Sequence, residues 1–266
     1  MRTTNHRLRS RARRALLGVV VLGVLAMAAV TLPRPLPATR VALAEETSGS
    51  MESSATTPAP LPQRMAHIGA AKQLIVATGA KLGAKYGALQ FFDFVDGSWV
   101  CTMSVPCRFG KNGLMDGARR WAGNKTTPTG IWMMPGYIFG THAHAPSGTR
   151  LRYRRITWKS WWSSKRGSTY NDWVEARRWP GERLANAPVQ YEYAISTGYN
   201  AKPNHVRYGR GSGIFLHMFG AGLTSGCVSV SRGNMIRICT LLDPAKQPTF
   251  AVGTLATGTP TAIAAY

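Results

Sequence analysis

The sequence is poor in acidic residues. Its 266 residues contain 11 Asp and Glu against 33 Lys and Arg, which gives a formal net charge of +22 at pH 7. Such an excess of positive charge favours anionic partners. Hydrophobic residues make up 44% of the chain. That share is enough for one sizeable core with appendages.

Two other features are scarce. Helical periodicity is rare, because turn residues interrupt short apolar runs along most of the chain. The six histidines, among them His142 and His144, lack a spacing that joins them to Cys or carboxylate ligands, so we expect no metal site and no cofactor. The pattern predicts a mainly β fold of twisted sheets, packed like a sandwich, with one or two helices and a long irregular insertion.

The strongest local signals are a hairpin and a helix. Asp96-Gly97 separates two apolar runs, which is typical of a two-residue hairpin turn. Ser231 is a good helix N-cap and Pro244 a stop signal, so a helix is expected between them. The expected strands cover residues 73–77, 89–95, 98–105, 131–134 and 248–252.

The first 44 residues are typical of an export segment. Six arginines precede an uninterrupted apolar run from Ala15 to Val30, and prolines follow it. Sixteen residues rise about 24 Å as a helix, short of the roughly 20 residues that usually span a bilayer. A signal peptide is favoured, and an N-terminal membrane anchor is the alternative.

The rest of the chain divides by composition. Residues 45–66 are rich in Ser, Thr and Pro and predict a spacer or a disordered terminus. Residues 67–255 carry the strand and turn signals of a folded domain. Residues 256–266 are rich in Ala and Thr and predict a flexible tail.

Cysteine is also scarce, with four in the chain. An exported protein meets an oxidising compartment, where disulfides persist. Cys101 and Cys107 flank Val105-Pro106 and are candidates for a disulfide across a short bend. Cys239 falls on the apolar face of the predicted helix, where a thiol behaves as a small hydrophobic group.

The fourth cysteine lies in the most informative segment. An apolar run ends at His217, and a Gly-rich connection leads to Gly226 and Cys227. An imidazole near a thiol makes an activated nucleophile, with His217 as base, so we expect thiolate to form below the usual pKa of about 8.5. The N–H groups of Gly226 and Cys227 could stabilise an oxyanion. His205 is the second candidate base.

The segment from Thr224 to Val228 resembles the signature of the L,D-transpeptidase family, the YkuD-type catalytic domain. That signature is a His on a strand followed by Ser/Thr-x-Gly-Cys-hydrophobic-Arg. Met218 stands where Gly commonly follows the His, and Ser229 stands at the position of the Arg. The likeness extends over roughly residues 70 to 253. Candidate substrate contacts are Thr224, Ser225 and Ser229.

The resemblance implies a β catalytic domain and a peptidoglycan L,D-transpeptidase. The Cys227 thiol would form a thioester with a donor stem peptide, and an amine of a neighbouring stem would take the acyl group. Two alternatives remain open. Water could replace the amine, giving an L,D-carboxypeptidase, or the domain could be a non-catalytic wall-binding module whose Cys227 is held in a disulfide.

Residues 150–183 combine many arginines and lysines with five of the eight tryptophans. Such a window can bind single-stranded nucleic acid, but an exported protein rarely meets it. Anionic wall polymers are the expected partners, and a solvated basic face is the alternative. Tyr153, Trp173 and Tyr208 are candidate groove residues. We expect export to the cell wall or periplasmic space, with membrane contact only through the N-terminal segment.

Overall fold

A computed structural model of the chain describes residues 60–266. The predicted signal peptide or anchor, and the predicted spacer up to residue 59, lie outside the described residues. None of the helices in the described part is long and apolar enough to cross a membrane.

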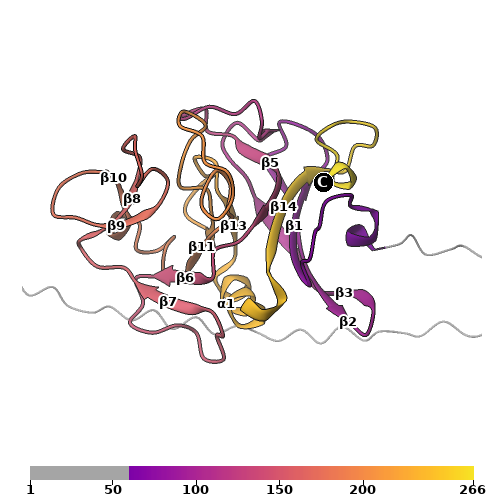
Figure 1. Cartoon of the computed structure of the whole chain (residues 1–266), viewed down its shortest axis with the longest axis horizontal. Coiled ribbons are helices and arrows are strands. Elements are labelled where there is room, and N and C mark those ends of the chain that lie inside the picture. The colour runs from indigo at the N-terminus through magenta and orange to yellow at the C-terminus, as the bar shows by residue number, and fades with distance from the viewer. Residues whose placement is uncertain (1–59) are drawn as a thin grey trace, which may run out of the picture. The chain divides into compact units, whose positions relative to one another are not determined.

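The described residues form a mainly β domain with a single α-helix (Figure 1). The strands are β1 (Gln73–Gly79), β2 (Tyr86–Val95), β3 (Ser98–Arg108), β4 (Leu114–Asp116), β5 (Thr127–Met133), β6 (Tyr137–Gly140), β7 (Arg152–Arg155), β8 (Ser160–Ser163), β9 (Trp173–Glu175), β10 (Gly181–Arg183), β11 (Ala194–Ser196), β12 (Phe215–Met218), β13 (Val228–Val230) and β14 (Thr249–Thr254). The helices are α1 (Arg232–Leu241) and the 3-10 turns η1 (Leu61–Arg64), η2 (Leu184–Asn186), η3 (Pro244–Lys246) and η4 (Ile263–Ala265).

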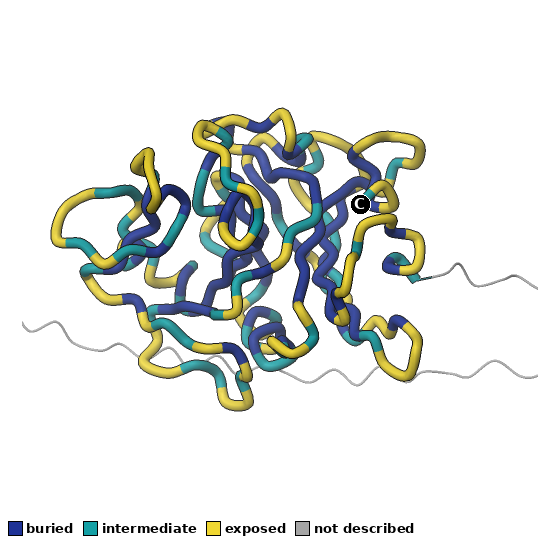
Figure 2. Tube along the Cα trace, in the orientation of Figure 1, coloured by how far each residue is buried: buried dark blue, intermediate teal, exposed yellow. Residues whose placement is uncertain are grey.

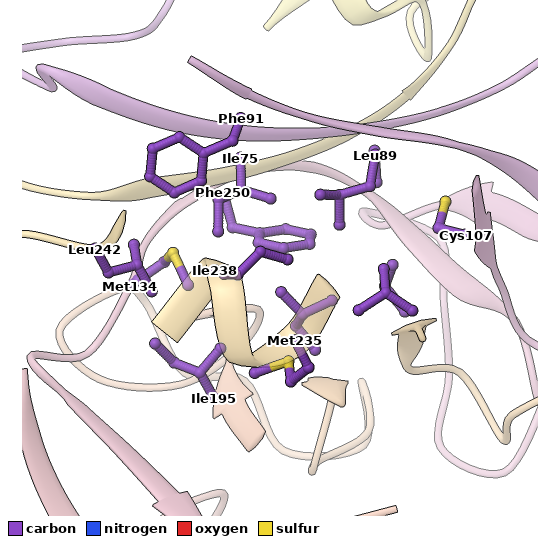
Figure 3. Close-up of a cluster of buried hydrophobic side chains, with 14 of the residues drawn as sticks. Ile75, Leu89, Phe91, Cys107, Met134, Ile195, Met235, Ile238, Leu242 and Phe250 are labelled. Atoms are coloured by element: carbon purple, nitrogen blue, oxygen red, sulfur yellow. The ribbon is translucent and has the colours of Figure 1, made fainter. Parts of the chain in front are cut away.

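Eleven strands form one sheet in the order β4-β5-β14-β1-β2-β3-β13-β12-β11-β6-β7, and β10-β8-β9 form a second, smaller sheet. The main core lies around α1. Met235 and Ile238 of the helix pack in one buried cluster with Phe250 of β14, Leu89 of β2 and Ile195 of β11 (Figure 3). Side chains from both halves of the large sheet thus converge on this helix.

Two smaller clusters cover the outer faces of the sheet. Leu74 and Val76 of β1 point away from α1 and pack with Met65 and Ile263 from the two ends of the described chain. Around β11 and β12, Phe215 packs against aromatic side chains of the smaller sheet. Central strands are therefore buried on both sides, while connecting loops carry most of the exposed residues (Figure 2).

The strongest local predictions are confirmed. Asp96 and Gly97 have positive φ angles of 48° and 79° and join β2 to β3 in an antiparallel hairpin, as a type I′ turn requires. The Ser231 side chain accepts a hydrogen bond from the Asn234 N–H at the start of α1. Pro244 follows the end of the helix and begins η3.

The structure differs from the sequence prediction at the insertion and at both ends. Residues 150–183 carry β7 to β10 and are not wholly irregular. The predicted tail is packed: the Thr254 N–H donates to Thr261 O, and the Tyr266 hydroxyl donates to Thr129. The His67 N–H donates to Tyr266 O at 2.9 Å. These backbone and hydroxyl contacts hold a segment that its composition alone predicts to fray.

The predicted disulfide between Cys101 and Cys107 is wrong, since both thiols are free. The expected bend at Val105-Pro106 is absent, because all four residues lie within the single strand β3. Six residues along an extended strand span about 20 Å. A disulfide needs Cα atoms within about 7 Å of each other.

We expect reductant to leave the melting temperature unchanged, and Cys101→Ser to change the free energy of unfolding by less than about 0.5 kcal/mol, because Cys101 is exposed and in no disulfide. Thermal unfolding with and without reductant measures both effects. Cys107→Ser is the matched control: it places a hydroxyl in the core, at a cost of about 1–3 kcal/mol. A reductant-sensitive loss of about 2–4 kcal/mol would show that a bridge forms after all.

Candidate active site

The pairing of β12 with β13 brings the two predicted catalytic residues together. The strands are parallel, and His217 stands opposite Ser229 in their register. Alternate side chains of a strand point to the same face, so Phe215 and His217 share a face. Cys227 directly precedes β13, and its sulfur accepts a hydrogen bond from the Phe215 N–H at 3.4 Å. Cys227 also packs in one buried cluster with Phe215, so the thiol lies on the face that carries the imidazole.

A pocket of about 490 Å³ is lined by both His217 and Cys227. One wall is the loop of residues 220–225, which follows β12. Glu182, Tyr191 and Lys111 contribute to the other walls. His205 lines a different pocket, with Arg207 and Arg210. The second candidate base is therefore not part of the cysteine pocket.

The His217 ring has a defined orientation. Its Nδ1 lies 2.7 Å from Met218 O, and since a carbonyl oxygen only accepts, Nδ1 carries the proton of the neutral ring. Nε2 is then the proton acceptor. The Tyr191 ring packs edge-on against the imidazole, with 5.5 Å between ring centroids. These two contacts are the arrangement that a general base requires: one nitrogen held, the other free to take a proton.

Burial keeps both groups uncharged. It raises the pKa of the Cys227 thiol to about 12. The hydrogen bond from the Phe215 N–H lowers this pKa, but by less than burial raises it. Burial also lowers the pKa of His217 to about 4. At neutral pH the site therefore holds a thiol and a neutral imidazole. The expectation that thiolate forms below pH 8.5 is not met by this resting arrangement, because burial has the largest effect on the pKa of the thiol.

The loop before Cys227 is held by Thr224. Its hydroxyl donates to Cys227 O at 2.6 Å and accepts from the Gly226 N–H at 3.1 Å. The Thr224 N–H donates to Phe109 O, which ties the loop to the end of β3. Thr224 thus shapes the turn that presents the thiol. Of the two predicted oxyanion donors, the Gly226 N–H is already engaged, and the Cys227 N–H is the remaining candidate.

The other two predicted substrate contacts differ in access. Ser225 is exposed and lines the pocket. Ser229 is fully buried, and its hydroxyl has no hydrogen-bond partner within residues 60–266. Ser229 is not among the residues that line the pocket. A substrate in the pocket can reach Ser225 but not Ser229.

One basic residue near the site has no sequence signal that marks it. Arg120 is 3% exposed, and its guanidinium donates to Thr126 O at 2.9 Å and to Arg210 O at 2.7 Å. Its Nη2 lies 2.9 Å from the position that a Cβ on Gly226 would occupy. Arg120 therefore packs against the loop that precedes Cys227 and brings a positive charge near the thiol. Only the fold brings residues so distant in sequence together.

The candidate groove residues are divided by the fold. Trp173 is buried in the cluster around Phe215, and the Tyr153 hydroxyl donates to His142 O at 2.7 Å. Tyr208 is 57% exposed. In the basic window, Trp158 and Trp179 are exposed as well, so this face presents rings as well as arginines to solvent. Among residues 60–266, no group of three or more His, Cys, Asp or Glu could hold a metal ion.

The fold and this pocket define a mainly β domain with a histidine and a cysteine on one sheet face. The sequence model of the YkuD family, described as the L,D-transpeptidase catalytic domain, matches residues 88–263. This covers more than half of the chain, and the protein belongs to that family. A search of curated proteins gives no significant match.

Family membership assigns the chain an L,D-transpeptidase-type catalytic domain. The corresponding substrates are peptidoglycan stem peptides, and the place of action is the cell wall or periplasm. The match begins within β2 and extends to the first residue of η4. The family match therefore covers the packed end of the chain as far as Ile263.

We expect His217 to make the protein less stable in acid. Its pKa is about 4 when folded and 6.5 when unfolded, so between these values the unfolded chain binds more protons. The contribution of the neutral His217 to the free energy of unfolding is fully present above pH 6.5 and is lost as the pH falls towards 4. The difference in free energy of unfolding between the native protein and His217→Asn should shrink by about 2–3 kcal/mol from pH 7 to pH 4.5.

Denaturant titrations at several pH values measure this difference. The comparison with the variant is needed because burial raises the pKa of Glu182, which favours the folded state in acid and so opposes the His217 effect. Glu182 makes the same contribution to the free energy of unfolding in both proteins, so it cancels in the difference. Parallel stability curves for the two proteins would contradict the burial of a neutral His217.

We expect Gly226→Ala to disrupt the loop that precedes Cys227. Gly226 has a φ of +138°, and an added Cβ would lie 2.8 Å from Thr126 O and 2.9 Å from Arg120 Nη2. Backbone strain of this kind costs about 1–3 kcal/mol. Thermal unfolding and thiol alkylation should both change. Gly222→Ala, in the same loop but with no atom within 4 Å, is the control and should behave as the native protein; equal behaviour of the two variants would refute the packing argument.

Proposed function

We propose that this protein is an L,D-transpeptidase that cross-links peptidoglycan stem peptides through a thioester on Cys227. The observation that carries the proposal is the shared pocket: Cys227 and His217 both line it, within a domain of the YkuD family. The remaining walls include a positive side chain, Lys111, a negative one, Glu182, and the hydroxyl of Tyr191, all of which can bind a peptide. No cofactor is required for this reaction, since the thiol and the imidazole supply the nucleophile and the base.

In the first step, the sulfur of Cys227 attacks the carbonyl carbon of the third residue of a donor stem tetrapeptide. The thiol proton passes to Nε2 of His217, and the S–C bond forms as the thiolate develops. The bond to the terminal D-Ala nitrogen then breaks. That nitrogen takes the proton from His217, and the products are free D-Ala and a thioester.

The neutral resting pair suits this route. A thiol with a pKa of about 12 is not a free anion at neutral pH, so its proton must leave as the bond forms. His217 is neutral over the same range and can accept it. The Cys227 N–H is the proposed donor to the oxyanion of the tetrahedral intermediate. Thr224 would act as a positioning residue through its hydrogen bond to Cys227 O.

In the second step, a neutral side-chain amine of another stem attacks the thioester carbon. A C–N bond forms, the C–S bond breaks, and the amine proton returns to the sulfur through His217. Attack by water would instead release the shortened stem, which is the L,D-carboxypeptidase reaction. Cys227 is free and 7% exposed, which is consistent with controlled access of a nucleophile from the pocket.

We also propose how the enzyme reaches the cell wall and contacts it. The exposed rings of Trp158 and Trp179, beside arginines of the same window, are suited to anionic wall polymers. Residues 1–44 would direct export, as a signal peptide or an anchor, and residues 45–66 would hold the domain away from that segment. At the end of this spacer, Met65 is buried in a core cluster and Leu61 packs against it, which anchors the spacer to the domain.

We expect Cys227→Ala to abolish thioester formation and cross-linking while the fold is kept. Incubation of the native protein with a tetrapeptide stem should give an intact mass increased by the stem minus D-Ala. His217→Asn should slow this acylation by about 100- to 10,000-fold, the usual loss when a general base is removed. Cys101→Ala, which removes an exposed thiol outside the pocket, is the control. An adduct on the Cys227→Ala protein would disprove the mechanism.

A further inference from the structure

A carboxylate shares the pocket with the nucleophile. Glu182 lies on β10 of the smaller sheet and lines the same pocket as Cys227. One carboxylate oxygen, Oε1, accepts a hydrogen bond from the Tyr191 hydroxyl at 2.7 Å. Since the Tyr191 ring packs against His217, the carboxylate and the base are held by the same aromatic side chain.

Glu182 has no cationic partner among residues 60–266. The salt bridges of this part of the chain use Asp93, Asp172, Glu192 and Asp243. Asp96, Asp116 and Glu175 form no salt bridge either, but of these acidic residues only Glu182 lines the pocket of Cys227. Glu182 is open to the solvent of the pocket, yet enough protein surrounds it for burial to raise its pKa. An arriving cation would offset that cost.

The second oxygen, Oε2, lies near the reacting sulfur. A Cβ placed on Gly213 would be 3.4 Å from Oε2, so the carboxylate lies against the Gly213 backbone. The carbonyl of Gly213 accepts a hydrogen bond from the Cys227 thiol at 3.3 Å. Gly213 is therefore the residue that lies between a group bound to Oε2 and the Cys227 thiol.

We propose that Glu182 is the subsite for a primary alkylammonium group of a stem peptide, with Tyr191 holding the carboxylate in place. This inference rests on the proposed function for its substrate class. A carboxylate with one oxygen held and the other free forms a strong charge-assisted hydrogen bond with an ammonium. The ammonium can come from the side chain of the donor stem or from that of the acceptor stem. Glu182 would thus select stems that carry a free side-chain amine.

The direct test is a binding measurement that needs no chemistry. Calorimetry with the Cys227→Ala protein compares a tetrapeptide stem bearing a free side-chain amine with the same peptide acetylated on that amine. We expect the free amine to bind roughly tenfold more tightly, the scale of a hydrogen bond to a charged group. Adding Glu182→Gln, which keeps the acceptor for Tyr191, should remove the preference. Equal effects of Glu182→Gln on both peptides, or none on either, would overturn the subsite.

Glu175→Gln is the matched control. Glu175 lies on β9 of the same small sheet, and its carboxylate accepts hydrogen bonds from Ser160 and Trp173 outside the pocket. It should leave the preference for the free amine unchanged. Loss of the preference in this variant too would assign the effect to the small sheet as a whole and contradict the role of Glu182.

Kinetics of the single variant Glu182→Gln then identify which stem supplies the ammonium. Slower thioester formation with the free-amine donor, but not with the acetylated donor, assigns it to the donor. Slower loss of a preformed thioester to an amine acceptor, with hydrolysis unchanged, assigns it to the acceptor. If the native protein forms no thioester, the proposed function fails, while the calorimetric preference still decides the subsite.

Discussion

The site depends on the parallel pairing of two short strands. β12 and β13 are neighbours in the sheet, with His217 opposite Ser229, and this register places the thiol of Cys227 beside the backbone of Phe215. A shift by one residue would turn either side chain to the other face. The pairing is supported from one side by α1 and the main core, and from the other by the aromatic cluster under the smaller sheet. The two candidate catalytic side chains thus lie on or directly before buried strands, with Cys227 7% and His217 6% exposed.

Burial also explains why the pair is uncharged in so basic a chain. A thiolate and an imidazolium would both lose solvation at this depth, and the Phe215 N–H only partly compensates the anion. The nearby charges, Arg120 behind the loop and Glu182 in the pocket, have opposite signs and oppose each other at Cys227. In the proposed mechanism the proton therefore moves while the bond forms, and no ion pair is stored beforehand.

Local signals predicted local structure well. The Asp96-Gly97 turn, the Ser231 cap and the Pro244 stop each act within a few residues, and each is found in the structure. The disulfide prediction failed because spacing in sequence does not tell whether a segment bends, and Val105-Pro106 continue a strand. At the C-terminus, likewise, composition predicts fraying, but Ile263 and Tyr266 have partners far away in the sequence.

The amino-acid sequence by itself determined the class of fold, the family signature and the identity of the thiol and imidazole, because these depend on residue type and on short spacings. Only the tertiary structure decided the environment of those groups. It placed Arg120 against Gly226 and Glu182 beside Gly213, and it buried Ser229 where a substrate contact was expected. The difference has one physical reason: pKa values, access and charge pairing depend on what surrounds a side chain, and the neighbours in this pocket come from segments as far apart in sequence as Lys111 and Cys227.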